Sequence, residues 1–296
     1  MKAKPFLKWA GGKSQLLSRF EELYPKELKI GIIENYYEPF VGSGAVFFDV
    51  AQKYKIKNAY LYDTNEVLIL TYQALKENVE NLLDILSRYQ KKYDKFCPEK
   101  RKEFYYKERD AHNAQKGDRF IRAARTIFLN KTCYNGLFRV NASGFFNTPA
   151  GIYKKPLICD EKNLIAVNNL LQKAEIKKAD FSEVERDLKP FSFVYFDPPY
   201  RPISKSANFN AYSKDGFDDK EQERLAELFN RLDQKGAKLA LSNSDPKNID
   251  PNDHFFDSLY QSFTIKRVPA TRMINSNVKK RGKINEIVVT NYEKAK

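Results

Sequence analysis

The tetrapeptide Asp197-Pro198-Pro199-Tyr200 follows a short apolar run, 193–196, and carries the most distinctive chemistry in the sequence. Its prolines have no N–H to donate, so they end a predicted strand and leave carbonyl groups, such as that of Pro198, as acceptors. Asp197 adds a carboxylate acceptor, and Tyr200 adds a flat ring that can stack. Two acceptors beside a ring suit an exocyclic amino group on a planar base. The alternative interpretation is an ordinary turn that only ends the strand.

A glycine-containing turn, Phe40-Val41-Gly42-Ser43-Gly44, follows another predicted strand and precedes an apolar segment. Glycines at a strand-to-helix turn let the backbone approach a ligand closely. The third glycine of the dinucleotide-binding pattern is absent. Asp63 lies 19 residues beyond Gly44, at the end of the next predicted strand, where a carboxylate can accept from both ribose hydroxyls of a nucleoside. The two features predict a nucleoside site, whereas Asp63 alone could be a turn residue.

A Gly-Gly turn lies between two lysines near the N-terminus, in Lys8-Trp9-Ala10-Gly11-Gly12-Lys13-Ser14. The first glycine of a phosphate-binding P-loop would fall at Leu7, and no predicted strand precedes the segment, so we exclude the nucleoside-triphosphatase class. The turn could hold a carboxylate-bearing or stacked ligand. It could equally form an arm that packs on the rest of the chain.

Basic, aromatic and small polar residues are interleaved between positions 134 and 153. Arginine can bind guanine with two hydrogen bonds, asparagine can pair with adenine, and an apolar side chain can wedge between bases. The segment contains Tyr134-Asn135-Gly136-Leu137-Phe138-Arg139, Phe146-Asn147-Thr148-Pro149 and Tyr153. It predicts a loop that reads a nucleic-acid groove, with a packed hairpin as the alternative.

The composition is that of a basic globular chain. The 296 residues include 52 Lys and Arg against 38 Asp and Glu, which gives a net charge of +14, and 14% of the residues are aromatic. This aromatic content excludes a disordered chain, and the length suits one large domain or a domain with an insertion. The positive charge favours a polyanionic partner, although it could serve solubility alone.

Cysteine and histidine are too few and too scattered for a disulfide framework or a multi-histidine metal site. The cysteines are Cys97, Cys133 and Cys159, and the histidines are His112 and His254. The N-terminal segment has no apolar signal region, and no apolar run is long enough to span a bilayer. We therefore expect a cytoplasmic protein without a metal, in a reducing compartment.

Predicted strands and helices alternate along most of the chain, which implies an α/β sheet. Strands are expected at 32–38, 58–63, 193–196, 237–244, 265–272 and 284–292, and a helix is expected at 219–235, ended by Gly236. From about 66 to 130 the apolar residues recur with helical periodicity, and loops with a short hairpin are expected at 134–156. We predict that block 66–159 is inserted between two parts, 1–65 and 160–296, of one domain.

With these motifs in this order, the sequence resembles the Dam family of DNA adenine-N6 methyltransferases, in the α-group order, and especially the members that modify GATC. The resemblance covers nearly the whole chain. Its motifs are KWAGGK at 8–13, EPFVGSGAVFF at 38–48, Asp63, YNGLFRVN at 134–141, FNTPAGIYKKP at 146–156, Asp180-Phe181, DPPY at 197–200, SANFNAY at 206–212, LSNS at 241–244 and RGKINEIVVTNY at 281–292. Their collinearity is more specific than any single motif.

The resemblance implies a doubly wound, mostly parallel, seven-stranded methyltransferase sheet with helices on both faces. It also implies that block 66–159 is a mainly helical target-recognition domain with a hairpin. S-adenosylmethionine is the implied methyl donor, with S-adenosylhomocysteine as product. Asp63 matches the residue that binds the ribose hydroxyls, and Asp180 and Phe181 match those that contact the cofactor's adenine. The positions that match the cofactor site are Trp9, Ala10, Gly11, Lys13, Pro39, Phe40, Gly42, Ser43, Gly44, Asp63, Asp180, Phe181 and Asp197.

The same resemblance assigns the tetrapeptide and the basic loop to the DNA substrate. Asp197, Pro198, Pro199 and Tyr200 match the catalytic positions that hold a flipped adenine. The implied DNA-binding residues are Lys8, Tyr134, Asn135, Leu137, Arg139, Asn147, Pro149, Tyr153 and Arg281. Of these, Tyr134 and Asn135 match the pair that enters the duplex beside the flipped base. One departure is Ile152, which stands where many members have an arginine.

The implied function is methylation of adenine N6 at a specific site in duplex DNA, with GATC as the expected site. A cytosine-N4 methyltransferase is an alternative, although such enzymes more often have serine at the position of Asp197. A methyltransferase of structured RNA and a catalytically silent DNA-binding protein are further alternatives. The expected partners of a monomeric enzyme are duplex DNA and, in a restriction-modification role, a cognate endonuclease.

Overall fold

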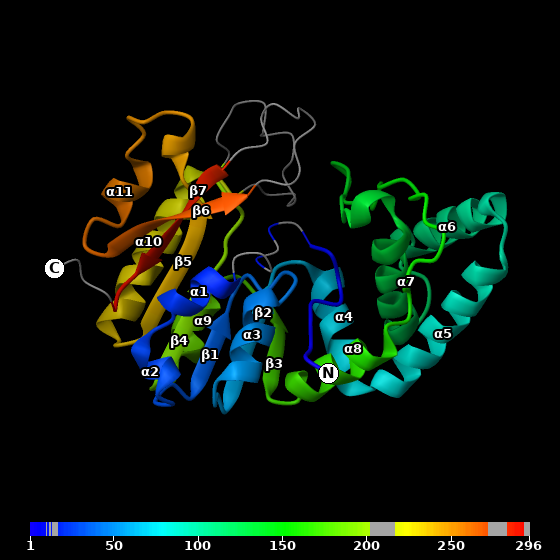
Figure 1. The fold of residues 1–296 in the computed structure, drawn as a ribbon, viewed down its shortest axis with the longest axis horizontal. Helices are drawn as coiled ribbons and strands as arrows, with labels where there is room; N and C mark the ends of the chain where they lie inside the picture. The colour runs from blue at the N-terminus through cyan, green and yellow to red at the C-terminus, as the bar shows by residue number, and fades with distance from the viewer. Residues whose placement is uncertain (10, 12, 14–16, 202–216, 272–282, 293–296) are drawn as a thin grey trace. The chain divides into compact units, whose positions relative to one another are not determined.

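The computed structural model describes residues 1–9, 11, 13, 17–201, 217–271 and 283–292 (Figure 1). The chain divides into two compact units. The first contains Met1–Ser14, Val41–Lys53 and Tyr62–Lys178, and the second contains Gln15–Phe40, Tyr54–Leu61 and Ala179–Lys296.

Within the described residues, seven strands form one sheet with the order β3-β2-β1-β4-β5-β7-β6. They are β1 (Asn35–Glu38), β2 (Asn58–Asp63), β3 (Ala174–Lys178), β4 (Ser192–Phe196), β5 (Lys238–Ser244), β6 (Thr264–Thr271) and β7 (Lys283–Thr290). Strands β2, β1, β4 and β5 pair in parallel, whereas β7 is antiparallel to both β5 and β6. The predicted α/β class with a mostly parallel sheet is confirmed.

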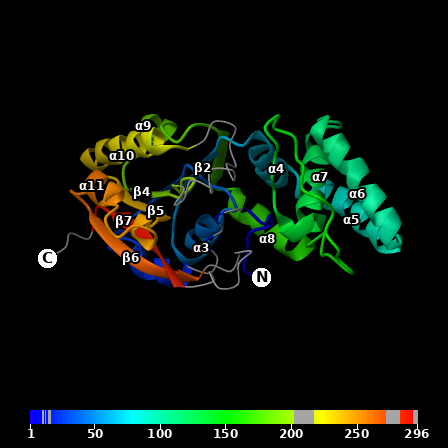
Figure 2. The ribbon, with the colours of Figure 1, turned by 90° about the horizontal axis from the view of Figure 1, so that it is seen from above.

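Strand β4, which leads into the tetrapeptide, is buried along its whole length in the second unit. Successive side chains of a strand point to opposite faces, so Phe193 and Phe196 separate. The Phe193 ring lies 6.1 Å from that of Tyr24, and the Phe196 ring lies 6.1 Å from that of Phe229. Figure 2 shows α9 (Glu183–Asp187) and α10 (Asp219–Gln234) together on one face of β4 and β5.

Helix α10 matches the predicted helix at 219–235. Its N-cap residue, Asp218, accepts a hydrogen bond from the backbone N–H of Glu221 at 3.1 Å, which satisfies one of the free donors at the helix start. Gly236 follows the helix with a φ of +78°, a conformation that favours glycine. The other helices of this unit are α1 (Leu17–Leu23), α2 (Lys26–Lys29), α11 (Phe255–Leu259) and the 3₁₀ turn Pro246–Asn248.

The first unit is rich in helices. They are α3 (Ala45–Lys53), α4 (Glu66–Glu77), α5 (Val79–Lys95), α6 (Pro98–Asn113), α7 (Arg119–Thr132) and α8 (Glu161–Leu171). Helix α7 contacts α4, α5 and α6, and its Phe128 lies within 5.1 Å of the rings of Tyr89 and Phe104. The helical texture predicted for 66–130 therefore reflects a bundle with its own core (Figure 1).

The segment after α7 folds back on itself as an irregular hairpin. Antiparallel bridges join Cys133 to Ala150 and Val140 to Phe146, and residues Tyr134–Gly136 form a 3₁₀ turn. Asn135 has a φ of +56°, which asparagine tolerates better than most residues. The short hairpin predicted for this segment is present.

Candidate active site

Asp197 follows β4 directly and is held by a side chain of the neighbouring strand β5. The Ser242 hydroxyl donates to Asp197 Oδ1 at 2.9 Å, and the Tyr195 hydroxyl lies 2.8 Å from the same Ser242 oxygen. Burial raises the pKa of Tyr195 well above its usual value, so the phenol keeps its proton. Because Ser242 uses its only proton on the carboxylate, Tyr195 must donate to Ser242. A chain of two donors from the core therefore fixes the orientation of Asp197.

The remaining tetrapeptide residues are anchored at several points. The Pro199 carbonyl accepts from Gln222 Nε2 at 3.1 Å, and the Tyr200 hydroxyl donates to Glu286 Oε2 at 2.6 Å. Burial raises the pKa of Tyr200, so its ring remains a neutral phenol. Pro198 is buried, whereas Asp197 and Tyr200 are half-buried. The sequence-predicted acceptor and ring therefore lie at the end of β4, fixed on several sides.

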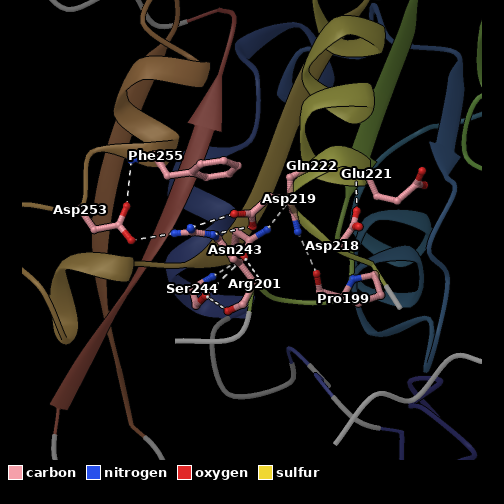
Figure 3. Close-up of polar contacts among 10 residues, drawn as sticks. All are labelled: Pro199, Arg201, Asp218, Asp219, Glu221, Gln222, Asn243, Ser244, Asp253 and Phe255. Carbon is pink, nitrogen blue, oxygen red and sulfur yellow. Dashed lines mark hydrogen bonds and ion pairs between the residues drawn. The ribbon is translucent and has the colours of Figure 1, made fainter. Parts of the chain in front are cut away.

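The side chain of Arg201, the next residue, ties the tetrapeptide to two other segments (Figure 3). Its guanidinium binds both carboxylate oxygens of Asp219, at 2.7 and 3.0 Å, and one oxygen of Asp253 at 2.7 Å. It also lies 4.2 Å from the centre of the Phe255 ring. Sequence reasoning missed this residue, since an arginine after a turn carries no signal until its acidic partners are placed.

Asp180 and Phe181 have one partner in common, Arg224 of α10. The guanidinium donates to both oxygens of Asp180, at 2.8 and 2.9 Å, and it lies 4.0 Å from the centre of the Phe181 ring. The hydrogen bonds from Arg224 hold the pKa of Asp180 well below its usual range. Phe40 and Phe217 also contact the Phe181 ring, which is only 2% exposed. A ligand can reach this ring only if one of its neighbours moves.

Residues 41–44 of the glycine-containing turn lie with Asp63 in the first unit. The two carboxylate oxygens of Asp63 accept from the backbone N–H groups of Gly42 at 3.2 Å and Asn65 at 2.9 Å. Burial nevertheless raises the pKa of Asp63 to about 6, against the lowering effect of these donors. At Gly44, φ is +68° and an added Cβ would lie 2.7 Å from the hydroxyl of Tyr72, so the missing side chain makes room for that tyrosine.

The N-terminal segment packs as an arm on the first unit. The backbone N–H and C=O of Lys8 both bond to the side chain of Asn130 in α7, each at 2.8 Å. The Trp9 ring stacks on Phe138 at 4.9 Å, and Lys13 is 4% exposed and donates to the Gly11 carbonyl. These contacts pack the segment on the first unit, and a role of Trp9 and Lys13 in holding a ligand stays a prediction. Ala10 lies outside the described residues.

The predicted nucleic-acid loop brings its polar and apolar side chains to one exposed segment. Arg139 Nε donates to Asn147 Oδ1 at 2.9 Å, and the Tyr134 N–H donates to the Pro149 carbonyl at 2.9 Å. The Tyr153 hydroxyl closes the base of the loop by donating to the Cys133 carbonyl at 3.1 Å. Asn135, Arg139 and Pro149 are exposed like Tyr134, and Leu137 is half-buried. Arg281 lies outside the described residues.

Across residues 1–9, 11, 13, 17–201, 217–271 and 283–292, no group of three or more His, Cys, Asp or Glu side chains is arranged to hold a metal ion. Among the helices that the structure describes, none is both long and apolar enough to cross a bilayer.

Comparison with known proteins places this chain among the DNA methyltransferases. The family model of the D12 class N6 adenine-specific DNA methyltransferases matches residues 9–274. The chain belongs to this family, and it is an adenine-specific DNA methyltransferase. The resemblance found in the sequence is confirmed.

The relatives align with the chain over almost its full length. The type II methyltransferase M.MjaIII of Methanocaldococcus jannaschii is 50% identical over 295 residues, which cover 99% of this chain and 100% of the relative. The type II methyltransferase M1.LlaDCHI of Lactococcus lactis is 36% identical, with 98% and 95% covered. The DNA adenine methylase of Escherichia coli is 33% identical, with 97% and 95% covered.

Proposed function

We propose that the enzyme transfers a methyl group from S-adenosylmethionine to N6 of an adenine that has been flipped out of duplex DNA. The observation that carries the proposal is the orientation of Asp197, which Ser242 and Tyr195 fix at the end of β4. A labelled methyl donor and an unmodified duplex test it. Digestion of the product to nucleosides should yield labelled N6-methyladenine, and labelled N4-methylcytosine would contradict it.

The residues present fit a nucleoside cofactor. The half-buried Asp63 carboxylate suits a ribose diol, because each of its oxygens has accepted one backbone N–H and retains a second lone pair. Asp180 and the Phe181 ring suit the amino group and the plane of an adenine. The resemblance to the family assigns Trp9, Lys13, Phe40 and the turn Gly42-Ser43-Gly44 to the same cofactor. S-adenosylmethionine, when bound, supplies a methyl group activated by a sulfonium.

Arg224 contacts Asp180 and Phe181, the two residues that we propose to bind the cofactor's adenine. It covers Phe181 and binds both oxygens of Asp180, so adenine has to displace it. We expect the Arg224→Gln variant to bind S-adenosylmethionine about threefold to tenfold more tightly, since the loss of one exposed ion pair and ring contact frees the site. Isothermal titration calorimetry measures this change.

Arg231→Gln is the matched control for that experiment. Arg231 lies two turns further along α10 and pairs with Glu185 at 2.9 Å. Its loss should leave cofactor affinity unchanged. Weaker binding by Arg224→Gln would mean that Arg224 supports the cofactor instead of competing with it.

The proposed chemistry starts with removal of the target adenine from the helix. The N6 amine inside a duplex cannot reach the cofactor, and extrusion costs a few kcal/mol of stacking and pairing. Stacking of the extruded base on Tyr200 returns about 1–3 kcal/mol. Tyr134 and Asn135, which are both exposed, are proposed to enter the gap in the duplex.

We propose that two hydrogen-bond acceptors of the tetrapeptide orient the N6 amine. Delocalisation of the N6 lone pair into the ring makes this nitrogen a poor nucleophile. We assign one N6 hydrogen to the Asp197 carboxylate and the other to the Pro198 carbonyl. Holding both hydrogens turns the nitrogen toward a tetrahedral shape and aims its lone pair at the methyl group, so that catalysis comes mainly from positioning.

Arg139 is the side chain that we propose to read a base edge. Its Nε is held by Asn147, which orients an otherwise exposed guanidinium. If it binds a guanine, the Arg139→Ala variant should lose about 1–3 kcal/mol of discrimination at one base pair. Methylation rates on a set of duplexes with single substitutions measure this loss. A uniform loss on every duplex would instead show that Arg139 binds a phosphate.

The wider role follows from the same proposal. We propose GATC as the target site, residues 66–159 as the part that recognises it, and a monomer acting on duplex DNA in the cytoplasm. The names of two relatives, both type II methyltransferases, support a restriction-modification role with a cognate endonuclease. Digestion of methylated DNA by enzymes that differ in sensitivity to GATC methylation tests the site.

A further inference from the structure

Two buried amide side chains, Gln222 of α10 and Asn243 of β5, lie beside the tetrapeptide and are 0% exposed (Figure 3). Gln222 takes a position on the apolar face of its helix, three residues before Leu225 and seven before Phe229, where a polar side chain is unexpected. Buried amides are costly unless all their groups are paired. These two are paired with each other and with the backbone around Tyr200.

The hydrogen bonds run in one direction through both amides. Gln222 Nε2 donates to the Pro199 carbonyl at 3.1 Å, and Asn243 Nδ2 donates to Gln222 Oε1 at 3.2 Å. Asn243 Oδ1 then accepts from the backbone N–H of Arg201 at 3.2 Å. Rotating either amide by 180° would place two donors or two acceptors face to face. The hydrogen bonds of the two amides are therefore consistent with only one orientation of each.

The two ends of this amide chain lie on either side of Tyr200. The Pro199 carbonyl belongs to the peptide group before Tyr200, and the Arg201 N–H belongs to the peptide group after it. Both peptide planes that meet at the Tyr200 Cα are therefore fixed by buried side chains. The Arg201 carbonyl is held as well, because the Ser244 hydroxyl donates to it at 3.1 Å.

We infer that Gln222 and Asn243 are positioning residues for the reaction, which set the Tyr200 ring at the place where the target base stacks. The inference rests on the proposed role of Tyr200. Neither amide touches the reacting atoms, so each acts through the backbone of Tyr200. Displacement of a positioned group by about 1 Å can cost about 100-fold in rate.

The test combines Gln222→Leu with Tyr200→Ala in a double-mutant cycle. Single-turnover methyl transfer should fall about tenfold to 100-fold in Gln222→Leu, with the dissociation constants for DNA and cofactor unchanged. The same substitution should add no loss in the Tyr200→Ala background, because the ring that it misplaces is then absent. An equal loss in both backgrounds, or no loss in either, would overturn the inference.

Asn291→Leu is the matched control. Asn291 also bridges backbone near β5, where it accepts from the Leu239 N–H at 2.8 Å and donates to the Ala237 carbonyl at 2.7 Å. Its loss should lower stability without changing the transfer rate below the unfolding temperature. If Gln222→Leu does not fold, Gln222→Glu replaces it, since an ionised carboxylate cannot donate to the Pro199 carbonyl.

A spectroscopic readout checks the ring directly. A 2-aminopurine at the target position should be quenched less by Gln222→Leu than by the unmodified enzyme, and an identical signal would contradict the inference. Failure of the unmodified enzyme to form N6-methyladenine would count against the proposed function. Normal transfer with no effect of Gln222→Leu would count against this inference alone.

Discussion

The Asp197→Ala variant is expected to lose methyl transfer by about 10³-fold or more, while it binds DNA and S-adenosylmethionine nearly as the unmodified enzyme does. The reason is that the carboxylate holds one N6 hydrogen of the target and is itself oriented by Ser242. A positioned proton acceptor contributes about 10²–10⁴-fold, and the geometry of the bound amine adds to this. Single-turnover rates with a labelled donor, beside binding measured by calorimetry, provide the test.

Two further variants serve as controls for the Asp197→Ala experiment. Asp250→Ala removes an exposed carboxylate of the same unit and should leave the rate unchanged. Ser242→Ala keeps Asp197 but removes the donor that orients it, so its rate should lie between those of the unmodified enzyme and Asp197→Ala. Normal turnover by Asp197→Ala would refute the catalytic role of this residue.

The second prediction of a large effect concerns the stability of the first unit, which contains Glu108 and Arg125. Arg125 and Glu108 form an ion pair at 2.9 Å, with side chains only 8% and 11% exposed, and the Tyr89 hydroxyl donates to the same Glu108 oxygen. The Glu108→Gln variant leaves the buried guanidinium without a counter-charge. We expect it to lower the free energy of unfolding by about 3–5 kcal/mol, as measured by urea denaturation.

The exposed pair of Glu66 and Lys178 supplies the comparison. Its atoms are 2.8 Å apart, but the side chains are 57% and 55% exposed. Glu66→Gln should therefore change the free energy of unfolding by less than about 1 kcal/mol. Equal effects of the two substitutions would show that burial does not set the strength of the Arg125–Glu108 pair.

The sequence was sufficient for the central strands and the long helices. Strands β1, β2, β4 and β5 have apolar runs that match their burial, and α10 has an amphipathic pattern with a glycine after its end. Strand β3 and helix α8 were not predicted. The sequence of β3, Ala174–Lys178, is mostly charged, since this strand lies at the edge of the sheet and buries only alternate side chains.

The site was predicted only in part, for a physical reason. The tetrapeptide that begins at Asp197 can be recognised from the sequence, because two prolines directly after a buried strand are unusual. The residues that hold the tetrapeptide cannot be recognised in this way. Gln222 and Asn243 are ordinary amides in the sequence, and only the fold places them against the backbone of Pro199 and Arg201. Likewise, no sequence pattern shows that Arg224 binds Asp180 and covers Phe181.

The most direct test of the account is the methylome of a methylation-free host that expresses this protein. Single-molecule sequencing gives the base, the position and the recognition site in one measurement. We predict N6-methyladenine at nearly every copy of one short site, with none in a strain that carries Asp197→Ala. Methylation of cytosine instead, or adenine methylation that persists without Asp197, would contradict the account.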